Sequence, residues 1–194
     1  MPFRIRTLNA ISQVGLSRLP GDKYTVGHDV TSPDALLVRS ASLHNQPIEP
    51  SVLAVARAGA GTNNIPIAEI SKHAVPVFNT PGANANAVKE LVVAGLFLAA
   101  RNIVDAAAFA HRLEGDHATM DKLVEAGKKN YVGFELPGRT LGVIGLGAIG
   151  VEVANVALSL GMNVLGYDPG ITVQHAWALS SQVEHVTDLN ELLK

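Results

Sequence analysis

In the first part of the chain, short apolar runs alternate with amphipathic stretches. Residues 35–38 and 53–56 are continuous apolar runs, which are typical of strands buried on both faces of a sheet. The expected strands cover residues 3–8, 24–26, 35–38, 53–56 and 75–78, and the expected helices cover residues 12–19 and 66–73. Regular alternation of strands and helices predicts a mostly parallel sheet covered by helices.

The second part of the chain has longer helical patterns. Residues 84–113 contain no helix breaker except Gly95, and residues 116–127 form a second, more polar pattern. A new strand–helix–strand unit then begins. Its expected elements are a strand at 140–144, a helix at 148–160, a strand at 163–167 and a last short helix at 187–194. We therefore predict one nearly complete small α/β domain, followed by the beginning of a second.

Composition excludes several classes of protein. The 194 residues are 47% hydrophobic, which is too apolar for a disordered chain. Fifteen basic and 17 acidic residues give a net charge of −2, which disfavours a nucleic-acid partner. The chain has no cysteine, so it has no disulfide framework and no thiolate metal site, and we expect no metal.

No membrane partner is expected either. The longest apolar run, residues 91–100, is shorter than the roughly 20 residues that span a bilayer. The N-terminal residues lack the basic start and long apolar core of a secretory signal. We therefore expect a cytoplasmic protein.

A glycine motif at the start of the second α/β unit indicates a nucleotide site. Gly145, Gly147 and Gly150 form a G-x-G-x-x-G that follows a predicted strand and opens a predicted helix. In such a loop the glycines allow a tight turn, a close approach of a pyrophosphate, and close packing of helix on strand. Asp168 ends the next strand, where an acid binds ribose hydroxyls and repels a 2′-phosphate. The motif therefore favours NAD over NADP.

Three segments in the first part also follow predicted strands, at the sheet edge where α/β proteins bind ligands. Arg39 could hold a phosphate or carboxylate, or it could be a solvated surface arginine. The small residues of 57–64 could surround an anion with backbone amides, or form a plain turn. Asn84, at the end of the third segment, could cap the long helix or touch a substrate.

Together these motifs resemble the D-2-hydroxyacid dehydrogenase family, and most of all its branch that acts on 3-phosphoglycerate. The segments that carry the resemblance are 38–40, 57–64, 79–84 with 88–91, 140–150 and 167–169. The resemblance implies a flavodoxin-like parallel-sheet substrate domain over residues 1–85. It further implies the first half of a Rossmann-type NAD-binding domain over residues 86–194. An interdomain helix at 86–113 would also shape the contact of a homodimer or higher homo-oligomer.

The resemblance also implies roles for individual residues. Arg39 and Ser40 would bind the phosphate of a small 2-hydroxy acid, and Asn84 would lie near that substrate. The substrate carboxylate would be bound by the backbone of Ala58, Gly59 and Ala60. The residues implied to bind NAD are Gly145, Leu146, Gly147, Ala148, Ile149, Gly150 and Asp168. The implied reaction is the oxidation of 3-phosphoglycerate to 3-phosphohydroxypyruvate, the entry to serine synthesis.

One departure from the family concerns catalysis. No position in 1–194 matches the family's catalytic arginine, glutamate and histidine, and His175 and His185 lack the motif that surrounds the family's histidine. We therefore expect the parent protein to be the enzyme and this chain to be a truncated, inactive portion. Two alternatives stay open: a dehydrogenase of the glyoxylate or lactate type, and a non-catalytic NAD-binding or oligomerisation module. Arg39→Ala separates the substrate classes, because an unphosphorylated acid needs no second anion site.

Overall fold

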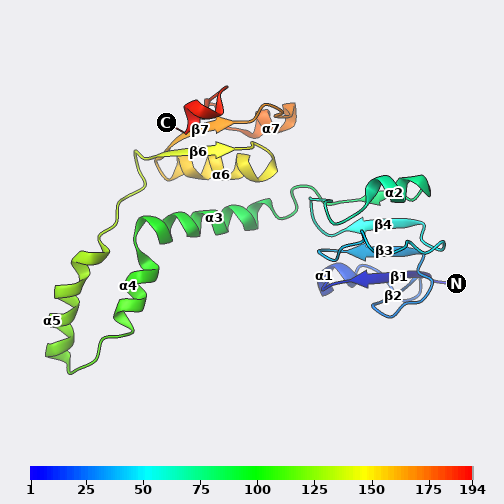
Figure 1. Cartoon of the computed structure of the whole chain (residues 1–194), viewed down its shortest axis with the longest axis horizontal. Coiled ribbons are helices and arrows are strands. Elements are labelled where there is room, and N and C mark those ends of the chain that lie inside the picture. The colour runs from blue at the N-terminus through cyan, green and yellow to red at the C-terminus, as the bar shows by residue number, and fades with distance from the viewer. Residues whose placement is uncertain (194) are drawn as a thin grey trace. The chain divides into compact units, whose positions relative to one another are not determined.

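The computed structural model describes residues 1–193, which fold into two compact units that divide between Ala83 and Asn84 (Figure 1). The first unit holds a five-stranded parallel sheet with the strand order β2-β1-β3-β4-β5. Its strands are β1 (Phe3–Leu8), β2 (Tyr24–Gly27), β3 (Ala35–Val38), β4 (Ala54–Arg57) and β5 (Val77–Phe78), and its helices are α1 (Gln13–Leu16) and α2 (Ile67–Lys72). The α/β class predicted from the sequence is confirmed.

The core of the first unit lies around its two central apolar strands. Val38 on β3 and Val55 on β4 are fully buried, as their continuous apolar runs predict. Leu43 and Ile70 pack against them from a loop and from α2. β5 lies at the edge of the sheet, in agreement with the presence of Pro76, which cannot donate to a ladder of hydrogen bonds.

The second unit holds a three-stranded parallel sheet with the order β6-β7-β8. Its strands are β6 (Thr140–Ile144), β7 (Asn163–Tyr167) and β8 (Glu184–His185). Its helices are α3 (Ala85–Ala100), α4 (Ile103–Ala110), α5 (His117–Gly127), α6 (Ala148–Ser159), α7 (Val173–Ala178) and α8 (Leu189–Leu192), with a 3₁₀ helix η1 (Lys128–Tyr131). The core is formed by β6, α6 and β7, and α3 packs along α6 (Figure 1).

The sequence predicts a single helix over 84–113, which includes the interdomain helix at 86–113. This prediction is wrong, because the chain forms two separate helices there. α3 ends at Ala100 and α4 begins at Ile103, and the two axes are bent by 63°. Asn102 lies between them in the left-handed region at φ +50. The Ala100 carbonyl accepts a hydrogen bond from the Phe134 amide (2.9 Å) instead of continuing the helix, and Asn102 donates to the Val132 carbonyl (3.1 Å).

Bilayer-spanning helices are not found among residues 1–193. No single helix there has both the length and the apolar character to cross a bilayer, and α3 and α4 meet these criteria only together, across their bend.

The contact that breaks the long helix requires a glycine at position 133. A Cβ added at Gly133 would lie 2.1 Å from the Ala100 carbonyl oxygen, and both neighbours it meets are backbone. We expect Gly133→Ala to destabilise the protein by about 1–3 kcal/mol, the cost of overpacking. Gly95→Ala is the matched control, because a Cβ at Gly95 on α3 meets nothing within 4 Å and alanine stabilises a helix by about 0.5–1 kcal/mol. Thermal unfolding of both variants measures the contrast, and equal midpoints would contradict it.

Candidate functional site

The carboxyl ends of β1, β3, β4 and β5 carry the first group of predicted site residues. Arg39 and Ser40 directly follow β3 and are both exposed to solvent. Asn9, after β1, fixes their backbone: its side-chain oxygen accepts hydrogen bonds from the amides of Ser40 (3.0 Å) and Ala41. Asn9 has φ 70, a conformation that asparagine tolerates better than most residues. The structure thus presents Arg39 on a braced loop.

The loop after β4 is held to its neighbours by its own backbone. The Ala58 amide donates to the Val38 carbonyl on the next strand (2.8 Å), and the Gly59 amide donates to the Arg57 carbonyl (2.9 Å). Asn79, at the end of β5, donates from its side chain to the Ala60 carbonyl (2.7 Å). The structure therefore brings the predicted residues 58–60 to the same sheet edge as Arg39 and Ser40.

Asn84 belongs to the second unit, where it precedes α3. Its carbonyl accepts the Val88 amide (3.0 Å), but its side chain makes no capping hydrogen bond. The side chain is exposed. Of the two roles considered for Asn84, side-chain capping of α3 is therefore not seen.

The glycine motif has the geometry of a phosphate-binding turn. Gly145 leaves β6 at φ +89, in a region that favours glycine. A Cβ at Gly150 would lie 1.9 Å from the Gly145 carbonyl oxygen, so only glycine lets α6 pack this close to the turn. A Cβ at Gly147 would meet nothing within 4 Å. The space beside Gly147 is open where the N-terminus of α6 begins.

The N-terminus of α6 offers amides to an anion. The first intrahelical bond at this end joins the Val151 amide to the Gly147 carbonyl (3.0 Å), so the amides of residues 148–150 have no helical acceptor. Unpaired amides and the positive end of the helix dipole favour a phosphate there. The residues present therefore fit the pyrophosphate of a dinucleotide.

Asp168 links the end of β7 to the glycine turn. One carboxylate oxygen accepts the Leu146 amide (2.7 Å), and the other accepts the Gly170 amide (2.8 Å). Sequence reasoning placed Asp168 at a ribose and did not foresee this bracing role. A carboxylate has about four acceptor positions, so two remain for the hydroxyls of a sugar.

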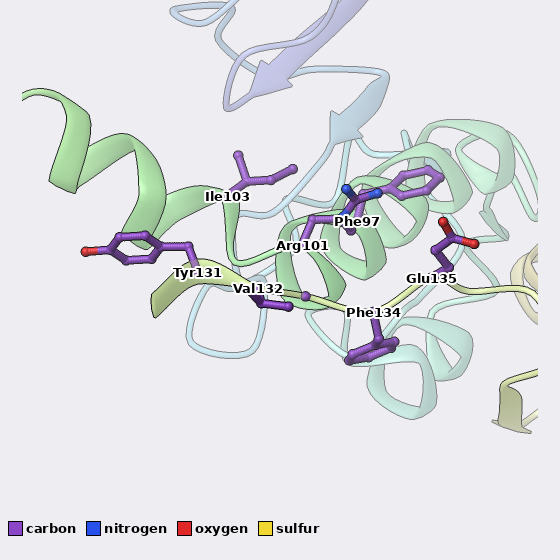
Figure 2. Close-up of a pocket in the computed structure, with 8 residues that line it drawn as sticks. Phe97, Arg101, Ile103, Tyr131, Val132, Phe134 and Glu135 are labelled. Atoms are coloured by element: carbon purple, nitrogen blue, oxygen red, sulfur yellow. The ribbon is translucent and has the colours of Figure 1, made fainter. Parts of the chain in front are cut away.

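A separate hollow of about 670 Å³ lies in the second unit, beside the break between α3 and α4 (Figure 2). Figure 2 shows it between the end of α3, with Phe97 on the helix and Arg101 directly after it, and the segment 131–135. None of the residues predicted to bind substrate or NAD lines this hollow. Among residues 1–193, no three histidine, aspartate or glutamate side chains are grouped so as to hold a metal ion.

Comparison with known proteins identifies related families. The sequence model described as "D-isomer specific 2-hydroxyacid dehydrogenase, NAD binding domain" matches residues 94–194. A D-3-phosphoglycerate dehydrogenase of Methanocaldococcus jannaschii is 37% identical over 168 residues, which cover 85% of this chain and 30% of the relative. A hydroxypyruvate reductase of Thermotoga maritima is 40% identical over 139 residues, covering 70% of this chain and 42% of the relative. This chain thus spans less than half the length of either relative.

Solved structures show the same fold. The NAD⁺-bound 3-phosphoglycerate dehydrogenase of Entamoeba histolytica matches with a TM-score of 0.66 at 24% identity, over 99% of this chain and 59% of that one. The D-mandelate dehydrogenase of Rhodotorula graminis matches with a TM-score of 0.73 at 22% identity, over 99% of this chain and 63% of that one. At these identities the likeness concerns the fold alone.

Proposed function

Because the chain belongs to the D-isomer specific 2-hydroxyacid dehydrogenase family, we propose that it contributes the substrate- and NAD-binding parts of such an enzyme. The proposed reaction is the oxidation of 3-phosphoglycerate to 3-phosphohydroxypyruvate. The observation that carries the proposal is the glycine turn braced by Asp168, with open space beside Gly147. The D-3-phosphoglycerate dehydrogenases among the relatives support the choice of substrate.

Each group on the chain has a distinct task in this proposal. The chemistry that NAD would supply when bound is the acceptance of the hydride that leaves carbon 2 of the acid. Residues 146–149 would lie along the pyrophosphate, with the free amides of 148 and 149 donating to it, and Asp168 would accept hydrogen bonds from the ribose. Arg39 and Ser40 bind the phosphate of the substrate, and the loop 58–60 binds its carboxylate. Asn84 is proposed to lie near the same substrate.

We expect the chain by itself to bind NADH without turning over substrate. Removing the proton from the substrate hydroxyl needs a positioned base with a pKa near neutrality, and the motifs assign no residue of this chain to that role. Binding can be followed through Trp177, the single tryptophan, which is exposed on α7. Its emission should be quenched and NADH emission sensitised on addition of NADH. Oxidation of NADH with 3-phosphohydroxypyruvate at a family-like rate would contradict this expectation.

A substitution at Arg39 tests whether the substrate carries a phosphate. Binding of 3-phosphoglycerate and of D-glycerate, which lacks the phosphate, is measured by titrating the ¹⁵N-labelled chain in two-dimensional NMR spectra. We expect Arg39→Gln to weaken 3-phosphoglycerate binding by about tenfold or more, the worth of a charged hydrogen bond, and to leave D-glycerate binding unchanged. Equal affinity of the unaltered chain for both acids would contradict a phosphorylated substrate.

Equal affinity for 3-phosphoglycerate and D-glycerate would favour the second candidate function, an enzyme that acts on an unphosphorylated acid. The relative named hydroxypyruvate reductase, at 40% identity, is the observation that supports it. In that case Arg39 would be a solvated surface residue. The loop 58–60 would still bind a carboxylate, because every 2-hydroxy acid carries one.

We also propose that the chain self-associates as a homodimer or higher homo-oligomer. The helices α3, α4 and α5 leave large apolar side chains exposed, more than scattered surface residues account for. These side chains are Leu91, Phe97, Leu98, Ile103, Val104, Leu123 and Val124.

A pair of exposed valines tests self-association. Val104 on α4 is 62% exposed and belongs to this apolar set, whereas Val14 on α1 is 80% exposed in the first unit. We expect Val104→Lys to lower the oligomeric mass measured by analytical ultracentrifugation, because a lysine would have to be desolvated in the interface. Val14→Lys should leave that mass unchanged. The same mass in both variants would show that α4 lies outside the interface.

A further inference from the structure

Arg57, the last residue of β4, has a side chain that folds back over the loop it precedes. A Cβ placed at Gly59 would lie 2.2 Å from the Arg57 Nη1 atom and 2.8 Å from Cζ. The guanidinium therefore occupies the space where a side chain at position 59 would lie. This puts a positive charge directly beside residues 58–60, the loop to which the substrate carboxylate is assigned.

The Arg57 side chain has no partner that explains its position. Its Nε is buried and lacks a hydrogen-bond partner, and the same is true of Oδ1 of Asn64 in the same segment. Two arginines on β1 behave differently: Arg4 pairs with Asp34 (3.2 Å) and Arg6 pairs with Glu49 (2.5 Å). Within residues 1–193, neither Arg57 nor Arg39 forms a salt bridge. A buried unpaired donor is rare in folded proteins and asks for an explanation such as a missing ligand.

The backbone of the loop cannot bind a carboxylate fully by itself. The amides of Ala58 and Gly59 already donate to the carbonyls of Val38 and Arg57. Among the described residues, no acceptor takes the amides of Ala60 and Gly61. These two amides offer two hydrogen bonds, whereas a carboxylate accepts about four, so acceptor positions are left for the Arg57 guanidinium.

We propose that Arg57 binds the substrate carboxylate together with the amides of Ala60 and Gly61, while Arg39 binds the phosphate. β3 and β4 are paired in register with Val38 opposite Arg57, so Arg39 and Arg57 stand at the ends of neighbouring strands. Neighbouring strand ends thus supply one cation for each of the two anionic ends of a three-carbon acid. This inference rests on the proposed function, but it assigns Arg57 to the anion that all 2-hydroxy acids share.

The two arginines are distinguished by the titrations with 3-phosphoglycerate and D-glycerate. We expect Arg57→Gln to weaken the binding of both acids by about tenfold or more, because both carry the carboxylate. Arg57→Lys keeps the charge but loses the planar two-pronged geometry, so its affinities should lie between those of the unaltered chain and Arg57→Gln. Arg18→Gln, which removes an exposed arginine of the same unit, is the control for the change in net charge and should bind both acids normally.

Each outcome of these titrations decides the inference. Normal binding of both acids by Arg57→Gln overturns it, and so does a loss confined to 3-phosphoglycerate, which would assign Arg57 to the phosphate. The spectra also report whether Arg57→Gln is folded; if it is not, the affinities of Arg57→Lys decide, and unchanged values overturn the inference. If the unaltered chain binds both acids equally, the phosphorylated substrate fails while the role of Arg57 is still judged with D-glycerate. Binding of neither acid overturns both proposals.

Discussion

Replacing Gly147 with alanine is expected to abolish most NADH binding while leaving the fold intact. A Cβ at this position meets no atom of the protein within 4 Å, so the only space it fills is the space that a pyrophosphate would approach. A pyrophosphate held away from the amides of α6 loses hydrogen bonds to a charged group, each worth about 1.5–3 kcal/mol, so we expect NADH affinity to fall by roughly tenfold to a hundredfold. The stability cost should stay at or below about 1 kcal/mol, the difference between glycine and alanine at a helix cap. Titration through Trp177 and thermal unfolding measure the two quantities.

Gly150→Ala is the matched comparison, because its effects should follow from a loss of fold. Its Cβ would lie 1.9 Å from the Gly145 carbonyl oxygen, a backbone atom that cannot move aside without opening the turn. We expect a loss of about 3 kcal/mol or more of stability, the upper range of overpacking. If Gly147→Ala bound NADH normally, the N-terminus of α6 would not be the pyrophosphate site. If Gly150→Ala were fully stable, the close packing of α6 on β6 would not be required.

The comparison of Gly147 with Gly150 shows how much of the site can be predicted from a sequence motif. Spacing and context alone predict the turn, its place after β6 and the identity of its three glycines, because their conformational needs are local. The motif also predicts a role for each glycine, and the backbone of Gly145 and the close contact at Gly150 agree with the predicted turn and helix packing. The size of each effect depends on the atoms that lie beside each glycine in space, such as the Gly145 carbonyl beside Gly150.

Other features were not predictable because distant residues determine them. The helical pattern over 84–113 is continuous in sequence, and α3 ends at Ala100 because the amide of Phe134, far along the chain, binds its carbonyl. β8 has two residues, too few for a periodic pattern, and it is positioned by the Val186 amide donating to the Gly166 carbonyl (3.0 Å). Arg57 begins the motif 57–64, so the sequence shows its position. That its Nε is buried without a hydrogen-bond partner can be seen only in the folded chain.

Asp168→Ala is expected to have the second large effect, because the carboxylate serves both the turn and the proposed ribose contact. The substitution leaves the amides of Leu146 and Gly170 without their present acceptors, and a lost hydrogen bond to a charged group costs about 1.5–3 kcal/mol. Leu146 is buried, so its amide is the more costly of the two to leave unpaired. We expect lower thermal stability together with a loss of NADH affinity of about tenfold or more.

Asp168→Asn separates the two roles of the carboxylate. Its side-chain oxygen can still accept the Leu146 amide, so much of the stability lost in Asp168→Ala should be retained. It no longer carries the negative charge that repels a 2′-phosphate, so the ratio of NADPH to NADH affinity should rise in titrations through Trp177. Asp188→Asn, at the cap of α8, removes a charge from the same unit and should leave that ratio unchanged. An unchanged ratio in Asp168→Asn would mean that Asp168 only braces the turn, and that the discrimination between the two cofactors lies elsewhere.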